Sequence, residues 1–230
     1  MQQNHSDSNK ETKNCWLYSF FDTWGPISLT VLLYAGIRHF IAEARYIPSG
    51  SMLPGLKVND RLIVEKLSLR KRSPSRGEIV VFNSPYSFDK KLIADRKKQL
   101  PSKLQCSFIT FPLISWIPTI SDRACDAYIK RVIAVGGDRL LINGKGEINL
   151  NGRSINEQYV EYFCSSEPKF NLCRPMSAIV PKGHVFVLGD NRANSWDSRF
   201  WPAGGFLPQK EILGKATWRF WPISRFGKID

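Results

Sequence analysis

The chain has 230 residues, of which 43% are hydrophobic and 23% are charged. These near-average values exclude a disordered, collagen-like or coiled-coil protein, and the length suits one medium domain or two small ones. Lys and Arg number 33 against 20 Asp and Glu, which gives a net charge of +13. Such a basic excess favours an anionic partner, either nucleic acid or a phospholipid surface.

The first predicted element is an apolar helix near the N-terminus. Residues 23–37 carry no charge, aromatic residues precede them, and Arg38 can snorkel toward an interface. We predict a polar tail over residues 1–22 and a membrane-spanning segment over residues 23–44, with its helix over roughly Pro26–Ala42. A cleavable signal peptide that ends in the A-x-A sequence at residues 42–44 and a buried amphipathic helix are the alternatives.

Five cysteines give a weak signal about the compartment. There is no CxxC pair and the three histidines lie far apart in the sequence, so we expect no metal site. In an oxidising compartment the four downstream cysteines would form two disulfides, of which Cys106–Cys125 and Cys164–Cys173 close the shortest loops. Free buried thiols are the alternative.

Short strands and turns are predicted beyond Arg45, because no helical periodicity of apolar residues follows the N-terminal segment. Asn143-Gly144 and the residues after it predict a hairpin between residues 140–142 and 147–150. We therefore expect a mainly β protein. The other expected strands are residues 61–67, 77–82, 128–135, 184–190 and 214–223.

Two basic segments interrupt this pattern, Lys66–Arg76 and Asp89–Lys103. The second is followed by an uncharged stretch that contains Phe108, Phe111 and Trp116 and is too short and too rich in proline to span a bilayer. Basic residues beside such a stretch suit a loop that rests on anionic lipid. A solvated basic loop beside a core strand is the alternative.

The first candidate for chemistry is the sequence YIPSGSMLPGL (residues 46–56), which predicts a constrained turn that holds the hydroxyls of Ser49 and Ser51. A serine nucleophile also needs a base. His5 and His39 lie in the tail and the apolar segment, so only His184 could complete a Ser-His-Asp triad. Lysine is the alternative base.

Lys130 is the candidate lysine. In the predicted strand YIKRVIAV, alternation places it on one face between Tyr128 and Val132. An amine in such surroundings is desolvated, which lowers its pKa and allows the neutral form to accept a serine proton. A lysine that snorkels from a strand edge is the alternative. A third segment, GDNRANSWDSRFW (residues 189–201), reads by itself as a hydrogen-bonded loop.

Together these segments resemble the characteristic boxes of bacterial type I signal peptidases, which are membrane-anchored serine proteases with a Ser/Lys dyad. The boxes are PSGSMLP, RGEIVVF, YIKRVIAVGGD and GDNRANSWDSR, in this order after an N-terminal hydrophobic segment. The resemblance spans about Ile37 to Pro222. It implies one N-terminal transmembrane helix followed by the β-rich fold that signal peptidases share with self-cleaving repressors of the LexA type.

The resemblance also implies roles for the motif residues. Ser51 would be the nucleophile and Lys130 the general base. The Ser49 hydroxyl and the Ser51 backbone N–H would form the oxyanion hole, and Ser195 would orient the lysine amine. The loop that carries Ser195 would also contain a structural ion pair, formed by Asp197 and Arg199.

The substrates implied by this resemblance are exported preproteins with N-terminal signal peptides and small residues at positions −1 and −3. Residues 1–22 would be cytoplasmic, residues 23–44 would anchor the chain in the plasma membrane, and residues 45–230 would form the extracytoplasmic catalytic domain. An anionic phospholipid bilayer is the expected second partner. Neither a cofactor nor a nucleic acid is expected.

The sequence departs from the family pattern in the connection at residues 83–127, which is unusually long. It also departs at Ala193 and Trp196, where relatives carry an acidic and a small residue, and at Pro202-Ala203-Gly204, which are extra. Two other functions are the alternatives. The first is a different Ser/Lys protease on the same fold, either a self-cleaving repressor or a pilus-processing peptidase. The second is a basic, membrane-anchored nucleic-acid-binding protein.

Overall fold

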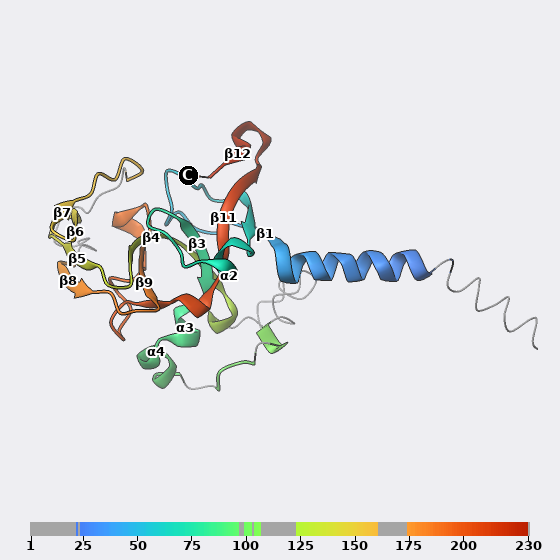
Figure 1. Cartoon of the computed structure of the whole chain (residues 1–230), viewed down its shortest axis with the longest axis horizontal. Helices are drawn as coiled ribbons and strands as arrows, with labels where there is room; N and C mark the ends of the chain where they lie inside the picture. Colours follow the sequence, from blue (N-terminus) through green and yellow to red (C-terminus); the bar gives the residue numbers. More distant parts are fainter. Residues whose placement is uncertain are drawn as a thin grey trace, which may run out of the picture. The chain divides into compact units, whose positions relative to one another are not determined.

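The computed structural model describes residues 22, 24–96, 99–102, 104–106, 123–160 and 174–229. The chain divides into two compact units, Met1–Glu43 and Ala44–Asp230, and each is described by itself. Figure 1 shows the elements of both units, coloured along the sequence.

The first unit contains the expected N-terminal helix. Residues 24–36 are α-helical and the π-helical turn η1 (Ile37–Ile41) continues them. Its large apolar side chains are exposed on all sides within this unit, and Leu32 for example is 69% exposed. Over the described residues, no helix combines the length and the apolar character that crossing a membrane requires. The predicted transmembrane span is therefore not confirmed.

The second unit is built on a large sheet, as the alternation of apolar residues predicted. Its strands lie in the order β1-β2-β11-β3-β4-β9-β10, and β12 pairs with β11 (Figure 1). Each of the five sequence segments expected to form strands overlaps one of these strands. The bounds are β1 (Ala42–Tyr46), β2 (Arg61–Glu65), β3 (Ile79–Asn83), β4 (Ala127–Val135), β9 (His184–Leu188), β10 (Leu207–Pro208), β11 (Ile212–Trp221) and β12 (Gly227–Lys228).

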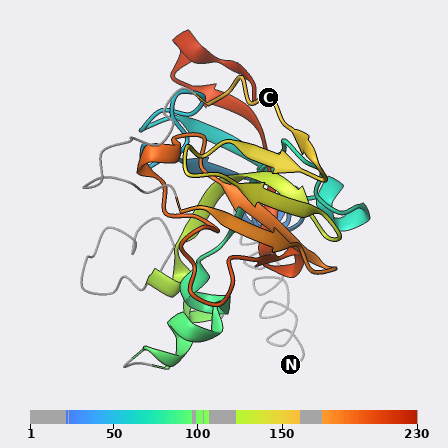
Figure 2. The same ribbon diagram turned by 90° about the vertical axis from the view of Figure 1, so that its left-hand side faces the viewer.

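A smaller sheet has the order β7-β6-β5-β8 and faces the viewer in Figure 2. Its strands are β5 (Arg139–Ile142), β6 (Ile148–Leu150), β7 (Arg153–Ser154) and β8 (Met176–Ile179). The predicted hairpin is confirmed, because β5 pairs with β6 in antiparallel register and Gly146 adopts a φ of 82° in the turn. Apolar residues of β5, β6, β4 and β9 form one core cluster between the sheets.

Strand β4 is central, since it lies between β3 and β9 and is buried from Lys130 to Ala134. Strand β3 pairs with it in antiparallel register, and Val80 lies opposite Lys130. On the other side the register with β9 shifts between Val132 and Ala134. Because consecutive buried residues point to opposite faces, both faces of β4 are covered, and the Lys130 side chain is removed from water.

The long connection at residues 83–127 joins the neighbouring strands β3 and β4. Asn83 and Ala127, at its two ends, lie opposite each other in the sheet. It begins with α3 (Pro85–Phe88), which the Ser84 hydroxyl caps, and α4 (Lys90–Ala94). It ends with the 3-10 turn η3 (Arg123–Cys125). Other short helices are α2 (Ser68–Lys71), η5 (Arg192–Asn194), η6 (Gln209–Glu211) and η7 (Ile223–Arg225).

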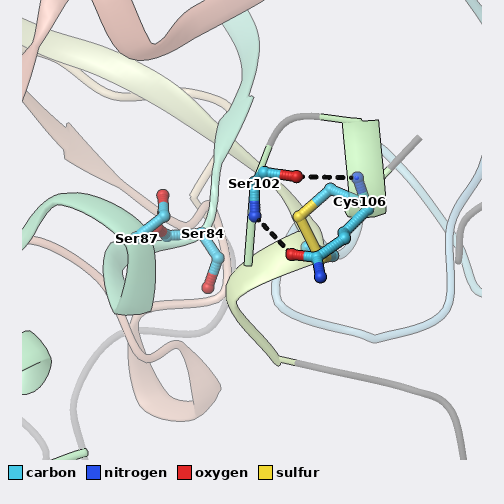
Figure 3. The surroundings of a disulfide bond; sticks show 6 residues. Ser84, Ser87, Ser102 and Cys106 are labelled. Atoms are coloured by element: carbon cyan, nitrogen blue, oxygen red, sulfur yellow. Dashed lines mark hydrogen bonds between the residues drawn. A yellow bond between two sulfur atoms is a disulfide. The ribbon is translucent and has the colours of Figure 1, made fainter. Parts of the chain in front are cut away.

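One of the two expected disulfides is confirmed. Cys106 and Cys125 are bonded, and the Cys106 backbone N–H donates to the Ser102 carbonyl at 2.9 Å (Figure 3). The pair Cys164–Cys173 lies outside the described residues, as does the stretch with Phe108, Phe111 and Trp116 on which the lipid-contacting loop was predicted.

Candidate active site

The structure brings the two central candidates together. Ser51 lies in the turn between β1 and β2, and Lys130 projects from the middle of β4. The Lys130 Nζ atom donates to Ser51 Oγ at 2.7 Å and to the Ile129 carbonyl at 2.9 Å. Two residues 79 positions apart in the sequence thus form one hydrogen-bonded pair.

The surroundings of Lys130 suit a base. The side chain is 3% exposed, and this burial lowers the pKa of Lys130 from its ordinary 10.5 to about 8. The carboxylates of Asp197 and Asp190 oppose the shift because they favour the charged amine, whereas the Arg199 guanidinium adds to it. Desolvation is the largest of these effects, so an appreciable fraction of the amine is neutral near neutral pH.

The turn that carries Ser51 is held by core packing and by hydrogen bonds from Asn191. Met52 and Leu56 are buried in a core cluster with Ile47, which anchors the turn to the sheet. Asn191 holds it from the side, because its backbone N–H donates to the Ser51 carbonyl and its side-chain amide donates to the Gly50 carbonyl, both at 3.1 Å. The nucleophile candidate is therefore pre-positioned.

The candidate oxyanion donors lie on this turn. The Ser49 hydroxyl donates to Ser51 Oγ at 3.4 Å, so the two serines face the same space. Within the described part of the chain, the Ser51 backbone N–H makes no hydrogen bond. A backbone donor without an internal partner beside a nucleophile is available to a developing oxyanion.

Ser195 lies beside the nucleophile turn, but it does not make the expected bond. A Cβ atom added to Gly189 would lie 2.2 Å from Ser195 Oγ and 2.4 Å from the Ser51 carbonyl oxygen, so glycine is required where these groups meet. Among the described residues, the buried Ser195 hydroxyl has no hydrogen-bond partner. In this structure Ile129, and not Ser195, supplies the second partner of the lysine amine, and the orienting role stays a prediction.

The predicted ion pair of Asp197 and Arg199 is present. Arg199 Nε donates to Asp197 Oδ1 at 2.8 Å, and Nη2 donates to Oδ2 at 2.9 Å. Asp197 Oδ2 also accepts the Gly189 backbone N–H at 3.0 Å. The pair therefore connects the loop to the end of β9, directly beside the residues that surround Lys130.

Two further buried ion pairs were missed by the sequence reasoning. Arg131, the neighbour of Lys130, donates to both carboxylate oxygens of Asp190 at 2.9 and 2.8 Å. Arg192 donates in the same way to Glu157. Arg131 and Asp190 both belong to motifs of the sequence, but their pairing depends on β4 and β9 lying side by side. Glu157 belongs to none of the motifs.

The alternative triad is not formed. His184 begins β9, opposite Pro208, whereas Leu188 at the other end of the strand lies opposite Arg131. The two ends are four residue steps apart, about 13 Å at the usual rise. The His184 Nδ1 atom lies 3.1 Å from the Lys182 carbonyl oxygen. His184 is thus far from the lysine that contacts Ser51.

A serine hydroxyl paired with a buried amine, beside an unoccupied backbone donor, is the arrangement of a serine hydrolase that uses lysine as its base. Comparisons with known proteins give the family. A family model described as signal peptidase, peptidase S26, matches residues 21–221. The chain therefore belongs to the signal peptidase family S26 and is a serine peptidase.

Individual relatives agree with this assignment. The chain is 40% identical to "Signal peptidase I" of Leptolyngbya laminosa over 88% of its own length and 80% of that protein. It is 39% identical to "Probable signal peptidase I-2" of a Synechocystis strain, over 90% and 78%. It is 34% identical to "Thylakoidal processing peptidase 1, chloroplastic" of Arabidopsis thaliana, over 82% of this chain and 44% of that protein.

Among solved structures, a signal peptidase I from Enterococcus faecalis matches 63% of this chain and 97% of its own, with 23% identity and a TM-score of 0.37.

Proposed function

We propose that the chain removes signal peptides from exported preproteins with Ser51 as nucleophile and Lys130 as general base. The observation that carries this proposal is the 2.7 Å contact between the Lys130 amine and Ser51 Oγ. The depressed pKa of Lys130 supports it, because only a neutral amine can accept the serine proton.

The reaction follows the usual course of acyl transfer. Ser51 Oγ forms a bond to the carbonyl carbon of the residue before the cut, and its proton passes to Lys130 Nζ. The negative charge on the carbonyl oxygen is held by the Ser51 N–H and the Ser49 hydroxyl, and one such donor contributes about 3–4 kcal/mol in comparable sites. Lys130 then protonates the departing amine, and the peptide bond breaks.

Hydrolysis of the acyl-enzyme completes the cycle. Lys130 accepts a proton from water, whose oxygen attacks the ester carbon, and the proton returns to Ser51 Oγ as it leaves. While Ser51 is acylated, the amine no longer faces a serine hydroxyl. We propose that the unpaired Ser195 hydroxyl then orients the amine, because a buried hydroxyl without a partner is costly and gains from such a bond.

Membership of the family supports preproteins as substrates. The resemblance of the sequence motifs implies small residues at positions −1 and −3 of these preproteins. An extended signal-peptide end would present its scissile carbonyl to Ser51. The discriminating experiment is cleavage of a purified preprotein by the detergent-solubilised chain. A substrate with Ala at −1 and −3 should be cut, and one with Leu at both positions should not. Equal cleavage of both would contradict this specificity.

We further propose that residues 23–44 anchor the chain in a membrane, in type II orientation, with the catalytic unit on the extracytoplasmic side. A helix whose apolar residues are exposed all round, such as Leu29, Val31 and Leu32, suits a lipid environment. The assay is carbonate extraction of membranes together with protease protection of the catalytic unit. Release of the chain by carbonate would contradict the anchor.

A second surface supports contact with lipid. At the end of β11 and on the turn before β12, exposed apolar side chains lie among basic residues, and Arg61 lies over the Trp221 ring at 5.9 Å. Aromatic and basic residues together suit an anionic interface. Arg219 and Arg225 of this region donate to the Gly55 carbonyl, so it adjoins the nucleophile turn. The exposed members are Trp218, Trp221, Ile223 and Phe226.

A further inference from the structure

A cluster of aromatic rings lies beside the strand that carries Lys130. At its centre is Trp196, whose ring stacks on Tyr86 at 5.7 Å between centroids with an interplanar angle of 25°. The Trp196 ring also lies 6.0 Å from Tyr128 and 6.3 Å from Trp201. Phe82 and Phe88 pack edge-on against Trp201 at 5.8 and 5.7 Å. One ring thus contacts three parts of the chain.

The rings belong to three segments, and two of these, β4 and the loop of Ser195, carry Lys130 and charged groups that act on its amine. Trp196 stands between Ser195 and Asp197 in the loop that surrounds the lysine amine. Tyr128 precedes Lys130 by two residues on β4, so both side chains belong to the same face of that strand. Tyr86 belongs to α3, at the start of the long connection. The Trp196 ring therefore joins the connection to the strand of the base.

A second contact joins the same segments. Asp89 is buried, and its Oδ1 atom caps α4 by accepting the backbone N–H groups of Lys91 and Leu92. Its Oδ2 atom accepts the Ala203 backbone N–H at 3.0 Å. Ala203 belongs to the three residues that are extra relative to the family pattern. The connection thus holds the loop on both sides of Trp201.

The loop needs such support. Over the described residues, two buried polar atoms lack a hydrogen-bond partner, Ser195 Oγ and Trp201 Nε1, and both belong to this loop. Burying unpaired polar groups costs free energy, so the loop's own hydrogen bonding does not favour this conformation. Packing of its apolar rings against Tyr86 and Tyr128 offsets that cost.

We propose that Trp196 is a positioning residue for the dyad, and that its stacking on Tyr86 makes the start of the long connection part of the catalytic apparatus. The ring holds the loop against β4 and excludes water from the amine. The proposal rests on the proposed role of Lys130 as base. The charged groups that face the amine are Asp197 and Arg199 from the loop and Asp190 after β9, and its nearest polar partner is the Ser51 hydroxyl.

The test compares Trp196→Ala, Trp196→Phe and Tyr86→Ala in the full-length, detergent-solubilised chain. Preprotein cleavage is followed as kcat and KM against pH. Trp196→Ala should lower kcat by about tenfold or more, because small misplacements near reacting atoms are costly. The rising limb of its activity–pH profile should move to higher pH, because water admitted beside Lys130 favours the charged amine. Trp196→Phe should restore both, and Tyr86→Ala should show the same changes to a smaller degree.

Met176→Ala is the matched control, because Met176 is partly buried in the cluster of the smaller sheet. It should lower stability without moving the pH limb. An unchanged limb and kcat in Trp196→Ala, or a limb that Met176→Ala moves equally, would overturn the positioning role. If Lys130→Ala still cleaved, the proposed function itself would fail, so the two failures are distinguishable.

Discussion

Arg131 forms a bidentate ion pair with Asp190, and this pair fixes β4, the strand of the base, to the end of β9. Lys130 and Arg131 are adjacent on β4, yet both are buried. The arginine is neutralised by its carboxylate, whereas the lysine is placed against Ser51 and loses proton affinity through desolvation. Of these two neighbouring basic residues, Arg131 therefore keeps its charge in a structural ion pair, whereas Lys130 is suited to act as a base.

The pH dependence of cleavage follows from the pKa of Lys130. The active form is the neutral amine, so activity should rise as pH climbs through about 8 and should be lost below it. The measurement is kcat/KM against pH for the wild-type chain and for His184→Ala. Both should show the same rising limb, and a limb that disappears with the histidine would favour His184 as the base.

The depressed pKa of Lys130 should make folding stability rise with pH, in the same direction as activity. Below its folded pKa of about 8 the lysine is charged in both states, and burial of that charge penalises the folded state. As pH rises above 8 the folded state releases its proton first, so stability should increase toward the ordinary lysine pKa of 10.5. Lys130→Met should therefore be inactive but no less stable at pH 7 by urea denaturation. A loss of more than about 2 kcal/mol would show that the amine stabilises the fold.

Gly189 should not tolerate a side chain. Alanine at this position would bring Cβ within 2.4 Å of the Ser51 carbonyl oxygen, which is backbone and cannot rotate away. Gly189→Ala should lower kcat by about 100-fold or more, because the nucleophile turn and the loop of Ser195 would move apart. Gly152→Ala is the control, since its φ is +83° but nothing lies within 4 Å. Equal activity of the two variants would contradict the crowding at Gly189.

Ser195→Ala tests the orienting role that the sequence motif implied. If the Ser195 hydroxyl pairs with the amine while Ser51 is acylated, the variant should retain its fold and lose about 10- to 100-fold in kcat. Deacylation should slow more than acylation, and single-turnover cleavage separates the two steps. Full activity would mean that the Ile129 carbonyl suffices to orient Lys130.

Much of this site could be predicted from the sequence because its signals are local. Alternation of apolar residues identified the strands, and the neighbours of Lys130 on its face indicated a buried amine. The partners of buried charges could not be found in this way, since Arg192 and Glu157 are brought together by tertiary packing alone. The same holds for the stacking of Trp196 on Tyr86, which joins segments 110 residues apart.

The central claim is that Ser51 and Lys130 act as one catalytic unit. The most direct measurement is the cleavage rate of a purified preprotein by wild type, Ser51→Ala and Lys130→Ala, all detergent-solubilised and all shown by circular dichroism to be folded. We predict that each single variant loses cleavage almost completely and that the double variant is no worse, as expected for residues that work together. Substantial cleavage by folded Lys130→Ala, or an additive further loss in the double variant, would contradict the account.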